Sequence, residues 1–144
     1  MIAPEEAGPG EPPTGGWSVD RLGPADAADM LSLATATEPG PFGARTGLLG
    51  VYLGIRDGGK LIAMAGERLQ PDGWTEISGV CTDPAYRGRG LARLLMELVA
   101  AGIRQGGRRP FLHVVAGNAG AIRLYEAMGY LIRREVQVTA YRPD

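Results

Sequence analysis

The segment from Val80 to Ala92, VCTDPAYRGRGLA, contains residues that could hold a phosphate. It is expected to run from a strand through a turn into a helix. The first N–H groups of a helix have no partner inside it and carry the positive end of its dipole, so they attract anions. Gly88 and Gly90 lack a Cβ, which lets a ligand approach the backbone. Residue 93 is Arg, so the segment is not a dinucleotide fingerprint, and a plain structural turn is the alternative to a phosphate site.

Charge is divided unevenly along the chain. Residues 1–86 carry 5 Lys/Arg against 12 Asp/Glu, whereas residues 87–144 carry 10 against 4. The C-terminal part therefore attracts anions, either a phosphate-bearing ligand or a nucleic acid, unless its arginines simply line solvated faces. Nucleic acid is the weakest of these interpretations. The arginines lie in the segment around Gly88 and Gly90, here called the glycine loop, or alternate with core positions, and aromatic residues make up only 6% of the chain.

Glu76 is the first candidate for acid–base chemistry. Strand alternation predicts two faces for the segment around it, Glu76, Ser78, Val80 and Thr82 on one and Thr75, Ile77, Gly79 and Cys81 on the other. A carboxylate on a central strand is costly to bury without a purpose. Cys81, opposite Val80 and Thr82, is interpreted as a small core residue rather than a nucleophile.

Two other side chains could move protons. Tyr125 shares a helical stripe with Ala121, Leu124 and Met128, so a core tyrosine is the alternative to a catalytic one. His113 lies in the middle of the strand-like segment FLHVV, where a core histidine is the commoner outcome. Its neutral imidazole would nevertheless suit a general base.

Two motifs together resemble the GNAT superfamily of acyl-CoA-dependent N-acyltransferases. Arg87-x-x-Gly90-x-Ala92 resembles the Gln/Arg-x-x-Gly-x-Gly/Ala signature that holds the pyrophosphate of CoA in that family. The segment from Asn118 to Tyr130, NAGAIRLYEAMGY, resembles the later family motif, in which an Asn opens a helix carrying LYE and GY/F. The order and spacing of the two motifs are similar to those of the family.

The resemblance implies a cofactor site and catalytic roles. Backbone groups of three strand residues would pair with the pantetheine arm, and the glycine loop would surround the pyrophosphate with added charge from its arginines. Asn118 would also contact CoA, beside its ordinary role as an N-cap, and Gly129 fits the C′ position of the same helix. The cofactor-binding residues would be Val80, Cys81, Thr82, Arg87, Gly88, Arg89, Gly90, Leu91, Ala92 and Asn118.

Direct acetyl transfer needs a neutral amine, a polarised thioester carbonyl and a protonated leaving thiolate. The resemblance makes Tyr125 the proton donor to the thiolate. It favours Glu76 as the base, with His113 or a water chain as rivals.

The surrounding elements predict a central mixed β-sheet flanked by helices, an α/β (α+β) class of fold that the resemblance identifies as the GNAT fold. Residues 1–16 are rich in Pro and Gly and are expected to form a flexible tail, and residues 17–144 a single N-acetyltransferase domain. Strands are expected over 17–21, 51–56, 60–69, 74–82, 110–115 and 131–141, and helices over 24–36, 91–106 and 119–128, with a surface loop at 38–46.

The expected function is transfer of an acetyl group from acetyl-CoA to a primary amine in a ternary complex, and the alternative is a non-catalytic acyl-CoA sensor on the same fold. A small-molecule amine is favoured over a protein amine, and Glu38, Phe42 and Arg45 are expected near it. One Cys and one His cannot supply the usual ligands of a structural zinc site, so no metal is expected. We expect a cytoplasmic bacterial protein with no membrane span and no nucleic-acid partner. The sequence leaves open the length of the acyl group and the oligomeric state, a homodimer included.

Overall fold

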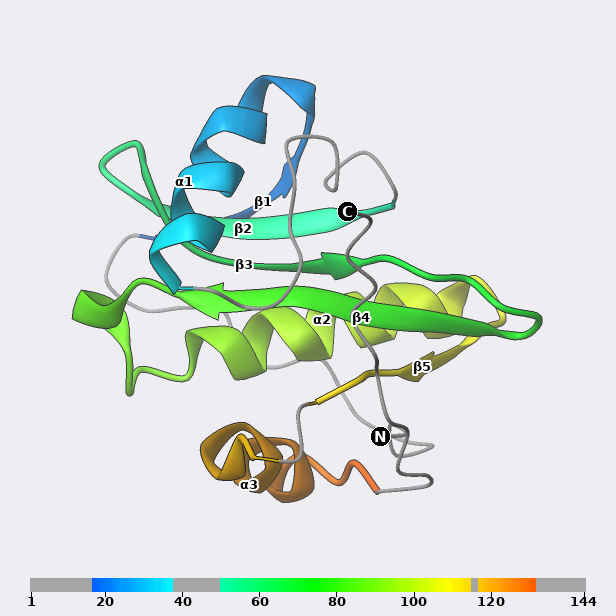
Figure 1. Cartoon of the computed structure of the whole chain (residues 1–144). Coiled ribbons are helices and arrows are strands. Elements are labelled where there is room, and N and C mark those ends of the chain that lie inside the picture. Colours follow the sequence, from blue (N-terminus) through cyan, green and yellow to red (C-terminus); the bar gives the residue numbers. More distant parts are fainter. Residues whose placement is uncertain (1–16, 38–49, 115–116, 132–144) are drawn as a thin grey trace, which may run out of the picture.

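A computed structural model describes residues 17–37, 50–114 and 117–131, and within them the elements follow the expected order (Figure 1). The predicted tail (1–16), the loop at 38–46 and the closing strands after Leu131 lie outside the described residues. The strands are β1 (Ser18–Leu22), β2 (Tyr52–Asp57), β3 (Lys60–Glu67), β4 (Trp74–Thr82) and β5 (Arg109–Phe111). The helices are η1 (Pro24–Asp26), α1 (Ala27–Thr37), η3 (Pro84–Tyr86), α2 (Leu91–Gln105) and α3 (Ala119–Ala127).

The sheet has the order β1-β2-β3-β4-β5, and its first four strands form an antiparallel meander. The three strands expected over 51–56, 60–69 and 74–82 are thereby confirmed, as β2, β3 and β4. Strand β5 returns parallel to β4 after the crossover through α2, which makes the sheet mixed. Helix α3 lies beyond β5, at the opposite end of the sheet from β1 (Figure 1).

Two apolar clusters pack on the sheet, one with each large helix. The spacing of Leu91, Leu94, Leu95, Leu98, Val99 and Ile103 predicts an apolar stripe on α2. Five of these six residues are buried in the cluster on the α2 side, and Leu98 is partly buried. Met96 and Ala100 of the same helix are buried there as well. The cluster on the α1 side joins Met30, Leu33 and Ala34 to Tyr52, Met64 and Cys81. Fully burying one such aliphatic side chain contributes about 1.5–3 kcal/mol, so these two clusters hold the helices to the sheet.

Helix α2 ends at Gln105, one residue before the end expected at 106, and Gly106 and Gly107 follow it. Gly107 has φ +76° and sits at C′. Its N–H donates to Arg104 O at 2.9 Å, and the Arg108 N–H donates to Ile103 O at 3.2 Å, the two bonds of a Schellman motif. The chain therefore turns directly from α2 into β5.

A β-bulge in β4 corrects the expected alternation. Ser78 pairs with Gly66 and Cys81 pairs with Met64, so Gly79 and Val80 together stand opposite a single residue of β3. Gly79 takes up the bulge with φ +64°. Val80 consequently packs with the α2-side cluster, whereas Cys81 lies in the α1-side cluster. The prediction that Val80 shares a face with Glu76 and Ser78 was wrong, and the prediction that Cys81 is a core residue is confirmed.

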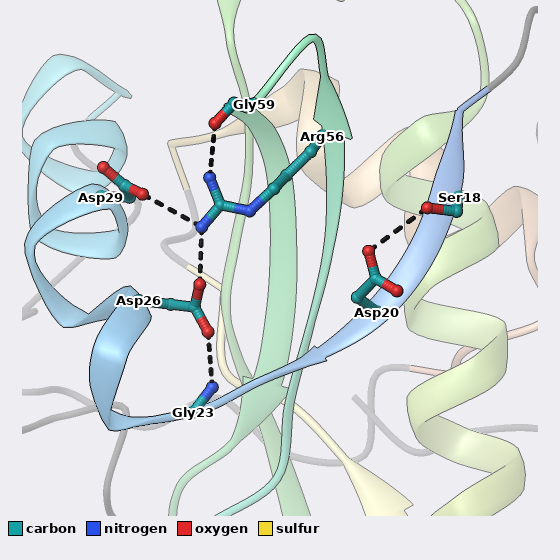
Figure 2. Close-up of polar contacts among 7 residues, drawn as sticks. All are labelled: Ser18, Asp20, Gly23, Asp26, Asp29, Arg56 and Gly59. Atoms are coloured by element: carbon teal, nitrogen blue, oxygen red, sulfur yellow. Dashed lines mark hydrogen bonds and ion pairs between the residues drawn. The ribbon is translucent and has the colours of Figure 1, made fainter.

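An arginine ties the start of α1 to the β2–β3 hairpin (Figure 2). The guanidinium of Arg56 lies 2.6 Å from Asp26 Oδ1 and 3.0 Å from Asp29 Oδ2, and it donates to Gly59 O at 2.7 Å. Asp26 also accepts the N–H of Gly23 at 2.8 Å. One side chain thus joins the hairpin turn to the segment leading into α1.

Candidate active site

The turn between β4 and α2 is held at its start by Asp83. The Asp83 carboxylate accepts the Ala85 N–H at 2.9 Å and lies 3.1 Å from Lys60 Nζ, and the Asp83 N–H donates to Ile62 O at 2.7 Å. The chain then passes through Gly88 (φ +81°) and Gly90 (φ +75°). Lys60 and Ile62, at the end of β3 that adjoins the β2–β3 hairpin, thus fix the position of Asp83, after which the loop with Gly88 and Gly90 begins.

The glycine loop is open on its ligand side. A Cβ built on Gly88 or Gly90 would meet no heavy atom within 4 Å, and in the described part of the chain no side chain caps the N-terminus of α2. The first N–H groups of α2 follow directly after this open backbone, and such groups carry the partial positive charge that attracts an anion. An anion that approached Gly88 or Gly90 would therefore meet backbone with no Cβ in its way.

Arg89 lies against two aromatic rings. Its guanidinium is 5.4 Å from the ring centroid of Trp17 and 5.6 Å from that of Tyr86, and these rings meet edge to face at 5.6 Å. The Tyr86 hydroxyl donates to Asp57 Oδ2 at 2.5 Å, and this bond raises the pKa of Tyr86. Arg89 thus holds its charge beside the loop while stacking on its neighbours, and Arg87 is exposed.

Strand β4 pairs with β5 over only the first third of its length. The parallel ladder joins Trp74, Thr75 and Glu76 to Arg109, Pro110 and Phe111, and in the described residues it goes no further. Strand β5 is therefore shorter than the predicted 110–115. Among the described residues, the rest of β4, up to Thr82, pairs with β3 alone, so backbone groups on its edge toward β5 could bind a ligand.

The ladder ends at a cluster of charged side chains. Glu76 is 1% exposed, and Arg68 binds both its oxygens, with Nε 2.5 Å from Oε1 and an η nitrogen 3.1 Å from Oε2. Nδ1 of His113 contacts Oε2 of the same carboxylate. The hydrogen bond to Glu76 raises the pKa of Arg68, which keeps the guanidinium charged. The two residues that the sequence offered as rival bases are therefore direct partners.

His113 is not the core residue that its sequence context favoured. It follows β5 rather than lying within it, and its side chain is 49% exposed. Sequence reasoning also missed Arg68. The signal was the carboxylate itself, because a buried Glu needs a charged partner and the adjacent strand end supplies one.

Helix α3 shows the predicted caps. Asn118 Oδ1 accepts the Ala121 N–H at 3.1 Å. Gly129 (φ +91°) donates to Glu126 O, and Tyr130 donates to Tyr125 O, both at 2.9 Å, which closes a Schellman motif. The two predicted caps of α3 are confirmed.

Tyr125 is partly buried and packs against the α2-side cluster, 6.2 Å from the ring of Tyr130. Burial raises the pKa of Tyr125, so its hydroxyl keeps its proton at neutral pH. None of the hydrogen bonds or ion pairs described for residues 17–37, 50–114 and 117–131 joins Tyr125 to Glu76 or His113.

The expected acceptor residues Glu38, Phe42 and Arg45 lie outside the described residues. Within the described ranges, no group of three His, Cys, Asp or Glu side chains could hold a metal ion. A search of the same residues finds no helix with the length and apolarity to cross a bilayer.

Known proteins resemble this chain in sequence and in fold. A family model described as FR47-like protein matches residues 52–139. Mycothiol acetyltransferase from Corynebacterium glutamicum is 30% identical over 122 residues, which are 84% of this chain and 36% of that protein. The N-alpha-acetyltransferase RimI from Mycobacterium tuberculosis is 40% identical over 82 residues, 55% of this chain and 51% of that protein.

Among solved structures, a GNAT-family protein from Novosphingobium aromaticivorans matches with a TM-score of 0.78 and 46% identity, over 88% of this chain and 56% of that one. The chain spans 36% and 51% of the lengths of the two curated relatives above.

Proposed function

Because this chain belongs to the FR47-like family of GNAT N-acetyltransferases, we propose that it transfers an acetyl group from acetyl-CoA to a primary amine. The observation that carries the proposal is the open backbone at Gly88 and Gly90, which follows the part of β4 that no described strand pairs on the β5 side. The family match and the acetyltransferase relatives support it.

The residues present fit acetyl-CoA. Backbone groups of Val80, Cys81 and Thr82 would pair with the pantetheine arm along the edge that β5 leaves free. Amides from Gly88 to Ala92 would surround the pyrophosphate, with the exposed Arg87 adding positive charge. Acetyl-CoA supplies an activated thioester carbonyl.

Side chains of this chain would accept and donate the protons that move during the reaction. The substrate ammonium must lose one proton before its nitrogen attacks and a second after the C–N bond forms. When the C–S bond breaks, Tyr125 donates its hydroxyl proton to the leaving thiolate and regains one from solvent. The Glu76–His113 pair supplies the base. One proton thus ends on the CoA thiol and one is released.

A small-molecule amine remains our preferred acceptor. One relative is named for mycothiol and another for N-alpha acetylation, so the two acceptor classes to test are small amines and free peptide N-termini. The alternative function is a sensor that binds acyl-CoA without turnover, which would have no chemical need for Tyr125.

The test incubates the protein with acetyl-CoA and a panel of small amines and peptides, and follows release of free thiol. Acetyl-CoA should first raise the melting temperature, because a ligand that binds only the folded state at a hundredfold excess over Kd stabilises it by about 2.7 kcal/mol. A thermal shift without thiol release from any amine would favour the sensor. No shift at millimolar acetyl-CoA would refute both functions.

A further inference from the structure

Resting on the acetyl-transfer function above, we propose that His113 accepts the proton of the amine through Nε2, and that Glu76 and Arg68 are the residues that position it. The sequence alone favoured Glu76 for this role. The structure reverses that preference, because the two side chains differ sharply in exposure and in the partners they hold.

Glu76 is poorly placed to meet a substrate. A general base must come within hydrogen-bond reach of the proton it removes. The Glu76 side chain is 1% exposed, and its two oxygens already receive two bonds from Arg68 and one from His113. An amine could reach this carboxylate only by displacing a charged, bidentate partner.

His113 has the exposure that Glu76 lacks. Its side chain is 49% exposed while Nδ1 is held against the buried carboxylate. A carboxylate paired with a guanidinium can only accept hydrogen bonds, so the proton it shares with the ring belongs to Nδ1. In the neutral ring, Nε2 then carries the lone pair. The pairing thus assigns the tautomer in which the other nitrogen is the base.

The backbone explains why these side chains meet. The Arg68 N–H donates to Glu76 O at 3.0 Å, which sets the two residues side by side on neighbouring chain segments. Glu76 and Phe111 form the last pair of the β4–β5 ladder, and His113 follows two residues later. The Phe111 ring meets the imidazole edge to face at 5.5 Å and so limits its rotation. The pair therefore stands where β4 and β5 part.

The other charged and titratable groups around Glu76 and His113 do not change the assignment of the ring proton to Nδ1. Arg68 adds positive charge behind Glu76, and Arg109 of β5 is held over the Trp74 ring at 4.4 Å. Tyr52 feels the charges of both Arg68 and Glu76, but burial raises the pKa of Tyr52 to about 12, so it is neutral in the working range. Glu76 is the negative partner that orients the imidazole.

The proton step balances without any further reactant. The ammonium N–H bond breaks and its proton forms a bond to Nε2 of His113, which becomes an imidazolium that Glu76 stabilises. Loss of that proton to solvent restores the neutral ring. The freed lone pair on the amine then attacks the thioester carbonyl.

The first test reads the ring directly and needs no acetyl-CoA. His113 is the only histidine of the chain, so its imidazole 15N resonances are unambiguous. At a pH where the ring is neutral, the wild-type proton should be on Nδ1. In Glu76→Gln, Arg68 should take the amide oxygen and leave the NH₂ to donate to Nδ1, which moves the proton to Nε2. Glu97→Gln on α2 is the matched control and should leave the tautomer unchanged.

The second test measures kcat/KM against pH. His113→Ala should lower kcat/KM at least tenfold, since a positioned base typically contributes about 10²–10⁴, and it should abolish the rise with pH. Added imidazole should restore part of the rate. Arg68→Lys keeps the charge but loses the bidentate grip, so it should lower kcat while leaving the KM for acetyl-CoA unchanged.

The outcomes separate this inference from the proposed function. A wild-type neutral ring protonated on Nε2, or a tautomer that Glu76→Gln does not change, would overturn it. It would also be overturned if His113→Ala kept the pH-dependent rise while Glu76→Gln abolished it, which would make Glu76 the base. If the wild type released no thiol with any amine, the proposed function and the base role of His113 would fail together. The tautomer measurement would still show whether Glu76 fixes which nitrogen of His113 carries the proton.

Discussion

Gly66→Ala should destabilise the sheet at β3, the strand next to β4, whose end is the proposed cofactor-binding edge. A Cβ on Gly66 would lie 2.4–2.5 Å from three ring atoms of Tyr52, whose side chain is 1% exposed. Carbon atoms pack best at about 3.5–4.0 Å, so the ring would have to move by roughly 1 Å. The whole ring is enclosed, since its hydroxyl end lies over Gly79 in the β4 bulge and the side chain is buried, so little free space is left for it to move into.

The expected cost follows from these distances. Overpacking a closed core typically costs about 1–3 kcal/mol, and the entropy that alanine removes from the unfolded chain returns only about 0.4–1 kcal/mol. The net loss should be about 1–2 kcal/mol. For a chain of this length that lowers the melting temperature by about 3–8 °C.

Calorimetry and urea unfolding would measure the change. Gly102→Ala is the matched control: it lies in α2 with no heavy atom within 4 Å of its added Cβ, and it should stabilise the helix by about 0.5–1 kcal/mol. The penalty at Gly66 should shrink in a Tyr52→Leu background, because the ring that causes it is gone. An undiminished penalty there, or a Gly66→Ala variant as stable as the wild type, would refute the reasoning.

Three further outcomes are expected. Gly90→Asp should abolish the thermal shift from acetyl-CoA by placing a carboxylate where phosphate belongs, whereas Gly90→Asn, uncharged and tolerant of φ +75°, should keep part of it. Tyr125→Phe should lower kcat at least tenfold in the thiol-release assay while leaving the Kd of acetyl-CoA nearly unchanged. Because burial raises the pKa of Tyr125, loss of its proton should not slow the wild type in the neutral pH range. The N–H of Gly23, and then Arg56, lower the pKa of Asp26 from 3.8, so Asp26 stabilises the fold above that pH and this stability is lost as the pH falls through the lowered value. The difference in melting temperature between the wild type and Asp26→Asn should therefore be widest near neutral pH and should narrow as the pH falls below 3.8; a constant difference would contradict this assignment.

Local sequence patterns were sufficient wherever the structure depends on neighbours along the chain. The helical stripe from Leu91 to Ile103, the N-cap at Asn118 and the C′ glycine at Gly129 were each readable, because periodicity and capping act within a few residues. The glycine loop belongs to the same class, since its open backbone follows from Gly88 and Gly90 themselves.

Tertiary structure decided what depends on pairing between distant segments. Strict alternation placed Val80 on the face of Glu76, but the bulge that reverses it arises from the register of β4 against β3. A core strand was expected around His113, but the ladder with β4 ends before it and leaves the ring half exposed. No pattern within one segment could show that Arg68, Glu76 and His113 meet. Their contact depends on three chain segments being brought to one point, and that is fixed by the packing of the whole sheet.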